Sequence, residues 1–461
     1  MIDMPTSTVD VAAIGAPPTA RDRWIYDWRP EDPVFWSATG RSVARRNLIF
    51  SILSEHVGFC IWSMWSAFVL FLGPEYGFDP AQKFLLTTLP TAVGAVLRIP
   101  YTFAVARFGG RNWTIFSAAL LLVPAVLAAA VLEPGVSFGT LLAVAAVAGV
   151  GDGNFASSMA NIDAFNPQRL KGWALGLNAG GGNLGVAAVQ LVGLAVLATA
   201  GAGHPRLILA VYIPLIVVAT VGAAVSMDNL THVTNERGAM REVARDPHSW
   251  VVSFLYIGTF GSFIGFGFAF GQVLQVQFGD TFHSPMRVAG LTFLGPLLGS
   301  LFRPVGGKLA DRFGGSRITL VVFAAMAAAA GLVLVASRVE SLALFVCAFV
   351  AIFVLSGLGN GSTYKMIPAI FRAKAGLAVA GGLDAEAADR GARRASRALI
   401  GIAGAVGALG GVAVNLVLRQ SFLSNGSGDA AYAAFIAFFL VCLAVTWVVY
   451  RRPSSSRLVG V

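Results

Sequence analysis

The stretch RIPYTFAVARFGGRN at residues 98–112 recurs as RPVGGKLADRFGGSR at residues 303–317. The offset is 303 − 98 = 205 residues, and it maps Arg107 onto Arg312 and one Phe-Gly-Gly onto the other without a gap. A second pair, GLNAGGGNLGVAAV from Gly176 and GIAGAVGALGGVAV from Gly401, is related by 401 − 176 = 225 residues. Both pairs occur in the same order along the chain, which indicates two related halves.

The composition is that of a membrane protein. Of the 461 residues, 56% are hydrophobic and only 12% are charged, whereas soluble domains have about 25% charged residues. The mean hydropathy is +0.73. The net charge of +10 does not indicate nucleic-acid binding, because the basic residues lie in short loops between apolar runs. The three cysteines have no metal-ligand spacing, so we expect neither a metal site nor a cofactor.

Twelve apolar runs are long enough to cross a bilayer, which takes about 20 residues each. We therefore expect an all-α integral membrane protein with 12 transmembrane helices in two pseudo-symmetric six-helix halves. The predicted spans begin near Asn47, Ala81, Trp113, Gly139, Trp173, Leu207, Trp250, Met286, Ile318, Leu342, Arg397 and Ala430.

The charges of the loops predict the orientation. Loops of even number hold the basic residues Arg107, Arg111, Arg169, Lys171, Arg237, Arg241, Arg245, Arg312, Arg317 and those from Arg372 to Arg397. The first loop has Lys83 alone and the fifth has Arg206. By the positive-inside rule, the even loops and both termini are expected in the cytoplasm, with the protein in the inner (cytoplasmic) membrane. The expected parts are a cytoplasmic tail (1–46), a first half (47–227), a linker (228–249), a second half (250–450) and a second tail (451–461).

Arg98 and Arg303 occupy equivalent places in segments that are otherwise apolar. An ionisable residue inside a membrane segment indicates a functional site, although such a side chain can also reach the interface or pair with an acid. Repeated halves are typical of alternating-access transporters with a site between the halves. Neither arginine has an acid one turn away on its own helix, so we expect a flat oxyanion between the two guanidiniums, held by bidentate hydrogen bonds. Two bare cations should hinder the return of the empty carrier, which favours exchange.

Several motifs resemble those of one transporter family. The loop GGKLADRFGGSR (306–317) resembles the major facilitator superfamily. WRPEDPVFW (28–36), LRIPYTF (97–103), GNFASSMANI (153–162), GLNAGGGNLGV (176–186), TFGSFIGF (259–266) and GNGSTYKMIP (359–368) resemble its NarK-type nitrate/nitrite porters. The resemblance covers nearly the whole chain and implies the major facilitator fold.

The resemblance also implies a substrate-binding site. Arg98 and Arg303 match two arginines that clamp the anion, and Tyr256 matches a tyrosine that donates to an anion oxygen. Phe155 and Phe260 match rings that sandwich the planar ion, and Asn183 matches an asparagine beside the site. Each also has a structural interpretation, as ordinary aromatic packing, an interfacial tyrosine or an amide between helices.

Three further ionisable residues lie within predicted spans, namely Glu55, His56 and Asp152. One interpretation is that one of them carries a coupling proton, since histidine titrates near neutral pH and burial shifts carboxyl groups toward it. The other is a local ion pair, between Glu55 and His56 or with a basic residue on another helix.

The glycine runs of the fifth and eleventh spans predict close helix packing. Gly181 and Gly185, like Gly407 and Gly411, are four residues apart. We expect these glycines to let the two spans slide against neighbours in the other half.

Together these observations predict a nitrate/nitrite transporter that works by alternating access and exchanges nitrate for nitrite. The alternatives are a nitrate/proton symporter and a facilitator of another small anion, such as formate or bicarbonate. No nucleophile–base pair or metal-ligand cluster suggests an enzyme, and only short segments outside the membrane remain for a sensor. The expected partners are nitrate and nitrite anions and membrane lipid, and the protein is expected to be a monomer.

Overall fold

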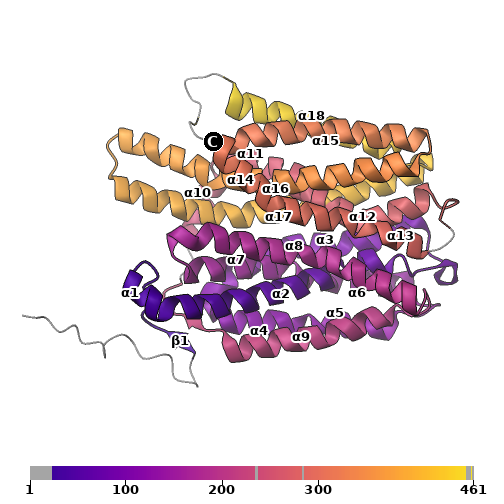
Figure 1. Ribbon diagram of the computed structural model, residues 1–461, viewed down its shortest axis with the longest axis horizontal. Coiled ribbons are helices and arrows are strands. Elements are labelled where there is room, and N and C mark those ends of the chain that lie inside the picture. Colours follow the sequence, from indigo (N-terminus) through magenta and orange to yellow (C-terminus); the bar gives the residue numbers. More distant parts are fainter. Residues whose placement is uncertain (1–22, 234–236, 283–284, 453–457, 459–460) are drawn as a thin grey trace, which may run out of the picture.

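The computed structural model describes residues 23–233, 237–282 and 285–452, together with 458 and 461. Within these residues, twelve helices are long and apolar enough to cross a membrane, which confirms the predicted number of spans. Figure 1 shows them running side by side, with the first half of the chain packed along the second. Strand β1 (Trp24–Ile25) and the C-terminus lie at the same end of the bundle, here called the terminal end.

The first six spans include three that are built from shorter helical pieces. In chain order they are α1 (Pro33–Phe35), η2 (Trp36–Gly40) and α2 (Arg41–Phe68); α3 (Pro80–Phe108); α4 (Gly110–Leu120) and α5 (Leu122–Val131); α6 (Phe138–Ala148), η4 (Gly149–Gly151) and α7 (Gly153–Phe165); α8 (Gln168–Thr199); and α9 (Arg206–Ser226). The short helix η3 (Pro74–Tyr76) lies between the first two spans.

The last six spans follow the linker, which contains β2 (Asn229–Leu230) and α10 (Arg237–Ala244). In chain order they are α11 (Pro247–Tyr256), η5 (Ile257–Gly261) and α12 (Ser262–Gln277); α13 (Pro285–Thr292) and α14 (Leu294–Phe313); α15 (Gly315–Arg338); α16 (Leu342–Ala380); α17 (Ala385–Asn425); and α18 (Asp429–Thr446) with η6 (Trp447–Arg451).

The two copies of the repeated stretch have the same backbone conformation. Gly109 separates α3 from α4 with φ 87° and ψ 146°, and Gly314 separates α14 from α15 with φ 91° and ψ 138°. Only glycine reaches such angles without strain. The repeat read from the sequence is therefore a repeat of structure.

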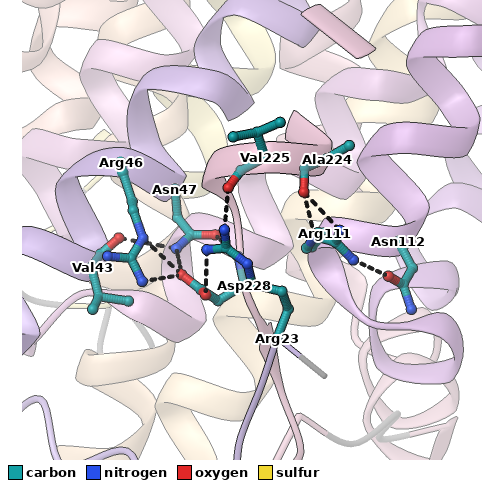
Figure 2. A network of polar contacts seen from close by, with 9 residues as sticks. All are labelled: Arg23, Val43, Arg46, Asn47, Arg111, Asn112, Ala224, Val225 and Asp228. Atoms are coloured by element: carbon teal, nitrogen blue, oxygen red, sulfur yellow. Dashed lines mark hydrogen bonds and ion pairs between the residues drawn. The ribbon is translucent and has the colours of Figure 1, made fainter. Parts of the chain in front are cut away.

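The first described residues of the chain, from Arg23 to Asn47, bind the linker that follows the sixth span (Figure 2). Strand β1 pairs in parallel with β2, with Trp24 opposite Asn229. The buried carboxylate of Asp228 binds Arg46 at 2.6 Å and lies 3.5 Å from Arg23. Asn47 receives a hydrogen bond of 3.0 Å from the main-chain N–H of Asp228. Within the predicted tail 1–46, residues 24–25 pair with the linker and residues from Pro33 onward belong to the first span.

Helices extend beyond the predicted spans at the terminal end. The expected loop between Arg372 and Arg397 is mostly helical, because α16 continues to Ala380 and α17 begins at Ala385. Asp384 caps the second helix, and ion pairs four residues apart join Glu386 to Arg390 and Asp389 to Arg393. Such pairs and caps stabilise exposed helix, so a polar sequence here does not mean a loop.

The halves contact each other closely at the end opposite the termini. The rings of Phe84 in α3 and Phe422 in α17 are stacked at 5.8 Å. The Thr87 hydroxyl donates to the side-chain oxygen of Asn415 at 3.0 Å, and Arg419 donates to the main-chain oxygen of Ala81 at 3.3 Å. Within the described residues, α3 and α17 are therefore in direct contact at this end.

Candidate anion-binding site

Arg98 is held at the centre of the bundle by groups from both halves. Its buried guanidinium donates from Nε and Nη2 to the two carboxylate oxygens of Asp152, at 2.8 and 2.6 Å. Its Nη1 donates to the main-chain oxygen of Gly404 at 3.1 Å. Asp152 lies in the fourth span, in the first half, and Gly404 lies in α17, in the second half. The guanidinium therefore links the two halves.

Two aromatic rings flank the same guanidinium. Its Cζ lies 4.6 Å from the centre of the Phe155 ring and 4.9 Å from that of Phe260. Phe155 belongs to α7 and Phe260 to η5, so again each half contributes one group. Ring faces attract cations. The two rings thus hold the Arg98 guanidinium from both halves.

The expectation that both arginines are bare is wrong for Arg98. Its acid partner is Asp152, 54 residues away on another span, so inspection of its own helix could not find it. The ion-pair interpretation is therefore the one that the structure shows for Asp152.

Arg303 occupies the equivalent place in α14 but has no acid partner among the described residues. Its Nη2 donates to the hydroxyl of Tyr256 at 3.2 Å, and its Cζ lies 5.6 Å from the centre of the Tyr364 ring. Its Nη1 is buried without a hydrogen-bond partner in the described part of the chain. This donor is available for an anion.

A stack of two rings connects the arginines. Tyr256 and Phe260 lie 5.1 Å apart and nearly parallel, at 9°. Phe260 contacts Arg98, and Tyr256 contacts Arg303. Four of the predicted residues thus form one continuous chain of contacts across the centre. Tyr364, which also lies beside Arg303, was missed as a site residue although it lies within the quoted motif GNGSTYKMIP.

Glu55 lies buried in α2, in a small polar cluster. One carboxylate oxygen accepts from the Ser158 hydroxyl of α7 and from the Asn178 amide of α8. The other oxygen has no hydrogen-bond partner among the described residues. Its carboxylate also interacts electrostatically with Arg303 and Arg98.

His56 does not contact this carboxylate. Its Nδ1 lies 2.9 Å from the main-chain oxygen of Gly181, in α8, and donates to it. The suggested ion pair between Glu55 and His56 is therefore not present.

Asn183 lies in α8 and is completely buried. Neither polar atom of its amide has a hydrogen-bond partner in the part of the chain that the structure describes. The structure gives no contact that joins this amide to either arginine. Its assignment to the site remains a prediction.

A cavity of about 460 Å³ leads from the terminal end to Arg98. Phe155 and Gly404 line it near the centre, and Lys171, Arg394 and Arg397 line it nearer the terminal end. Asp163 also lines it, and its carboxylate binds Lys171 at 3.0 Å and Arg397 at 2.8 Å. Because Asp163 lies in α7 and Arg397 in α17, this ion pair joins the halves at the end where the cavity opens.

The glycines of the fifth span pack within their own half, contrary to expectation. A Cβ added at Gly185 would lie 2.6 Å from the main-chain oxygen of His56, and one at Gly181 would lie 2.6 Å from the Ile52 side chain. Both neighbours belong to α2. In the eleventh span, a Cβ at Gly407 would meet Tyr256 at 2.5 Å, whereas one at Gly411 would meet both Ile264 and Thr91 of the other half. Three of these four glycines therefore allow close packing between helices of the same half, and only Gly411 also meets the other half.

Comparison with known proteins identifies the family of the chain. Residues 54–383 match the family described as the Major Facilitator Superfamily. The chain is 38% identical over 455 residues to the nitrate/nitrite transporter NarU of Escherichia coli (strain K12), which covers 94% of this chain and 97% of that protein. It is 36% identical over 380 residues to the probable nitrate/nitrite antiporter NarK2 of Thermus thermophilus, covering 77% and 84%.

A solved structure has the same fold at low sequence identity. The bacterial homologue of the human lysosomal transporter Spinster, in its inward-facing and unoccupied conformation, matches with a TM-score of 0.61 and 17% identity. The match covers 88% of this chain and 96% of that one. The protein is thus a multi-pass membrane transporter, not an enzyme, and it belongs to the major facilitator superfamily and, within it, to the family of NarK-type nitrate/nitrite porters.

Proposed function

We propose that this protein carries nitrate and nitrite across the membrane by alternating access, with the anion bound between Arg98 and Arg303. The observation that carries the proposal is the row Arg98–Phe260–Tyr256–Arg303, which crosses the centre between the halves. Guanidinium donors and aromatic faces suit a flat, delocalised oxyanion. The relatives NarU and NarK2 are named for nitrate and nitrite, which supports this choice of anion.

Alternating access is supported by the unequal ends of the interface. The halves are in close contact at Phe84, Thr87 and Ala81, whereas the cavity opens at the terminal end. We propose that rocking of the halves closes this cavity and opens the other end. The distribution of basic loop residues supports a cytoplasmic terminal end in the inner membrane, and we propose that the carrier works as a monomer.

The first coupling mode is exchange of external nitrate for internal nitrite. Both ions carry one negative charge, so the exchange leaves the charge of the site unchanged and needs no titrating group. A second mode, nitrate/proton symport, is favoured by one specific observation. Asp152 already neutralises Arg98, so the repulsion between two bare cations does not prevent the empty carrier from returning.

Labelled nitrate uptake into proteoliposomes tests the function and separates the modes. Vesicles are loaded with nitrite or with neither anion, with and without an inward proton gradient. Uptake only into nitrite-loaded vesicles means exchange, and uptake into unloaded vesicles that follows the proton gradient means symport. Competition by formate and bicarbonate tests whether another small anion is preferred.

A matched pair of variants ties the activity to the site. Arg303→Gln should abolish uptake in both assays, because it removes the guanidinium that has no acid partner among the described residues. Arg206→Gln removes an arginine from an exposed ion pair with Glu133 and should leave uptake unchanged. Equal uptake by the two variants would contradict the proposed site.

A further inference from the structure

The charged groups at the centre of the bundle are balanced without a substrate. Two arginines, Arg98 and Arg303, and two carboxyl groups, Asp152 and Glu55, are all buried there. Both arginines interact electrostatically with Glu55. With both acids ionised, these four side chains sum to zero charge. An isolated charge is costly in a medium of low polarity, so a carrier can cross between its two states more easily when this sum stays near zero.

The two acids are not equivalent, because Asp152 is fully engaged. Both of its oxygens accept hydrogen bonds from one guanidinium in a side-on pair. A proton added to Asp152 would turn one of these oxygens into an O–H group and break the two-point pair. Asp152 therefore acts as the fixed counter-charge of Arg98.

The second half lacks this counter-charge. Gly151-Asp152-Gly153-Asn154 in the first half corresponds to Gly357-Leu358-Gly359-Asn360 in the second, with an offset of 206 residues. The packing agrees, since a Cβ at Gly94 of α3 would meet Asp152, and one at Gly357, beside Leu358, would meet the main-chain oxygen of Gly299 of α14, which is the repeat mate of Gly94 (299 − 94 = 205). Leucine thus occupies the place of the aspartate, which leaves Arg303 for the substrate.

Glu55 is the acid whose charge can change. One of its oxygens is bound by Ser158 and Asn178, which are neutral groups, and the other has no partner among the described residues. Within the part of the chain that the structure describes, the charged groups that act on it are Arg98 of α3 and Arg303 of α14. Neither is hydrogen-bonded to it, so a proton can be added without breaking an ion pair.

We propose that Glu55 takes up one proton for each nitrate that binds beside Arg303, so that the site has the same charge empty and loaded. This inference rests on the proposed function and deepens its coupling. In the empty carrier, two cations balance two carboxylates. In the loaded carrier, nitrate replaces the charge that Glu55 loses to the proton. The predicted transport is symport of one proton per nitrate, with no net movement of charge.

The first test measures the wild-type protein in proteoliposomes. A pH-sensitive dye inside the vesicles reports proton entry while labelled nitrate is counted. The expected ratio is one proton per nitrate, and a membrane potential set with potassium and valinomycin should leave the uptake rate unchanged. Nitrate movement without any proton entry would overturn the inference yet leave the proposed function standing, whereas no nitrate movement in any assay would overturn the proposed function itself.

The second test compares Glu55→Gln with the wild type. Glutamine resembles the protonated acid, so the loaded state can still form, but the empty site then carries one uncompensated positive charge. The ratio of nitrate/nitrate exchange to proton-driven net uptake should rise at least tenfold. Glu133→Gln, a charge change at the exposed pair with Arg206, should leave this ratio unchanged. A wild-type ratio in Glu55→Gln refutes the role of this residue, and if that variant does not fold, the wild-type proton count still decides.

Discussion

Gly361 sits where the helix that carries Arg303 passes α16, and it offers a sharp test of how the site is positioned. A Cβ added there would lie 2.2 Å from the main-chain oxygen of Arg303 and 2.5 Å from the main-chain nitrogen of Gly307. Carbon–oxygen contacts normally need about 3.3 Å or more. Main-chain atoms cannot rotate away, so Gly361→Ala should push α14 and α16 apart by about 1 Å.

The energetic cost can be isolated with a second glycine on the same helix. Gly376→Ala adds the same methyl group to α16, but nothing lies within 4 Å of the new atom. Both substitutions gain about 1 kcal/mol from the better helix propensity of alanine, so this gain cancels in their comparison. What remains is the overpacking cost of about 1–3 kcal/mol at Gly361.

The displacement should also reduce substrate binding. Moving Arg303 should lengthen or break its 3.2 Å hydrogen bond to the Tyr256 hydroxyl. A hydrogen bond to a charged group contributes about 1.5–3 kcal/mol, so the apparent affinity for nitrate should fall on the order of 10- to 100-fold. The assays are thermal unfolding in detergent and nitrate uptake into proteoliposomes. If the melting temperature of Gly361→Ala equals or exceeds that of Gly376→Ala, and its affinity for nitrate is unchanged, the close packing of α14 and α16 does not position the site.

Three further predictions follow from ion pairs. Asp152→Asn should destabilise the protein by about 3–5 kcal/mol, since it leaves Arg98 buried without a counter-charge. Added nitrate should then raise the melting temperature of this variant more than that of the wild type. Equal increases in melting temperature would contradict this role of Asp152. Asp163→Asn should increase the labelling rate of a cysteine introduced at Ala160, in the cavity, by up to about fivefold. The reason is that it removes an ion pair between the halves that contributes about 1 kcal/mol. An unchanged labelling rate would mean that this ion pair does not limit access to the cavity. Asp228→Ala should lower the stability by about 1–3 kcal/mol, since it removes the charged hydrogen bonds from Arg46, whose own charge stays accessible to water. A melting temperature like that of the wild type would exclude this role for Asp228.

The number of spans and the relation between the halves could be predicted because both follow from patterns within short stretches of sequence, which can be recognised and compared without knowing how the helices pack. A run of about 20 apolar residues has few alternatives to a membrane helix, and the Phe-Gly-Gly of each repeat imposes its own backbone angles. The helix ends were less predictable. Caps and ion pairs such as Glu386–Arg390 extend helices past the membrane, where hydropathy no longer distinguishes helix from loop.

The contacts of the site could be predicted only in part. Tyr256 and Phe260 are four residues apart, and their stacking follows from that spacing. The pairing of Arg98 with Asp152 depends on how two separate spans pack, which no local pattern records. The same holds for the glycines of α8, whose partner helix turned out to be α2 rather than a helix of the other half.

The contacts of Asp228 with Arg46, together with the pairing of β1 and β2, form a clasp between the two ends of the first half. This clasp has a consequence for folding during synthesis. Arg46 and Asp228 are 182 residues apart, and β1 meets β2 across a similar distance. Once residue 230 has left the ribosome, every group of this clasp has been synthesised, while all six later spans are still to come. The contacts between residues 23–46 and residues 228–230 can therefore form before any helix of the second half has been synthesised. Domains generally fold as units during synthesis, N-terminal first, so the later half would assemble against a finished template.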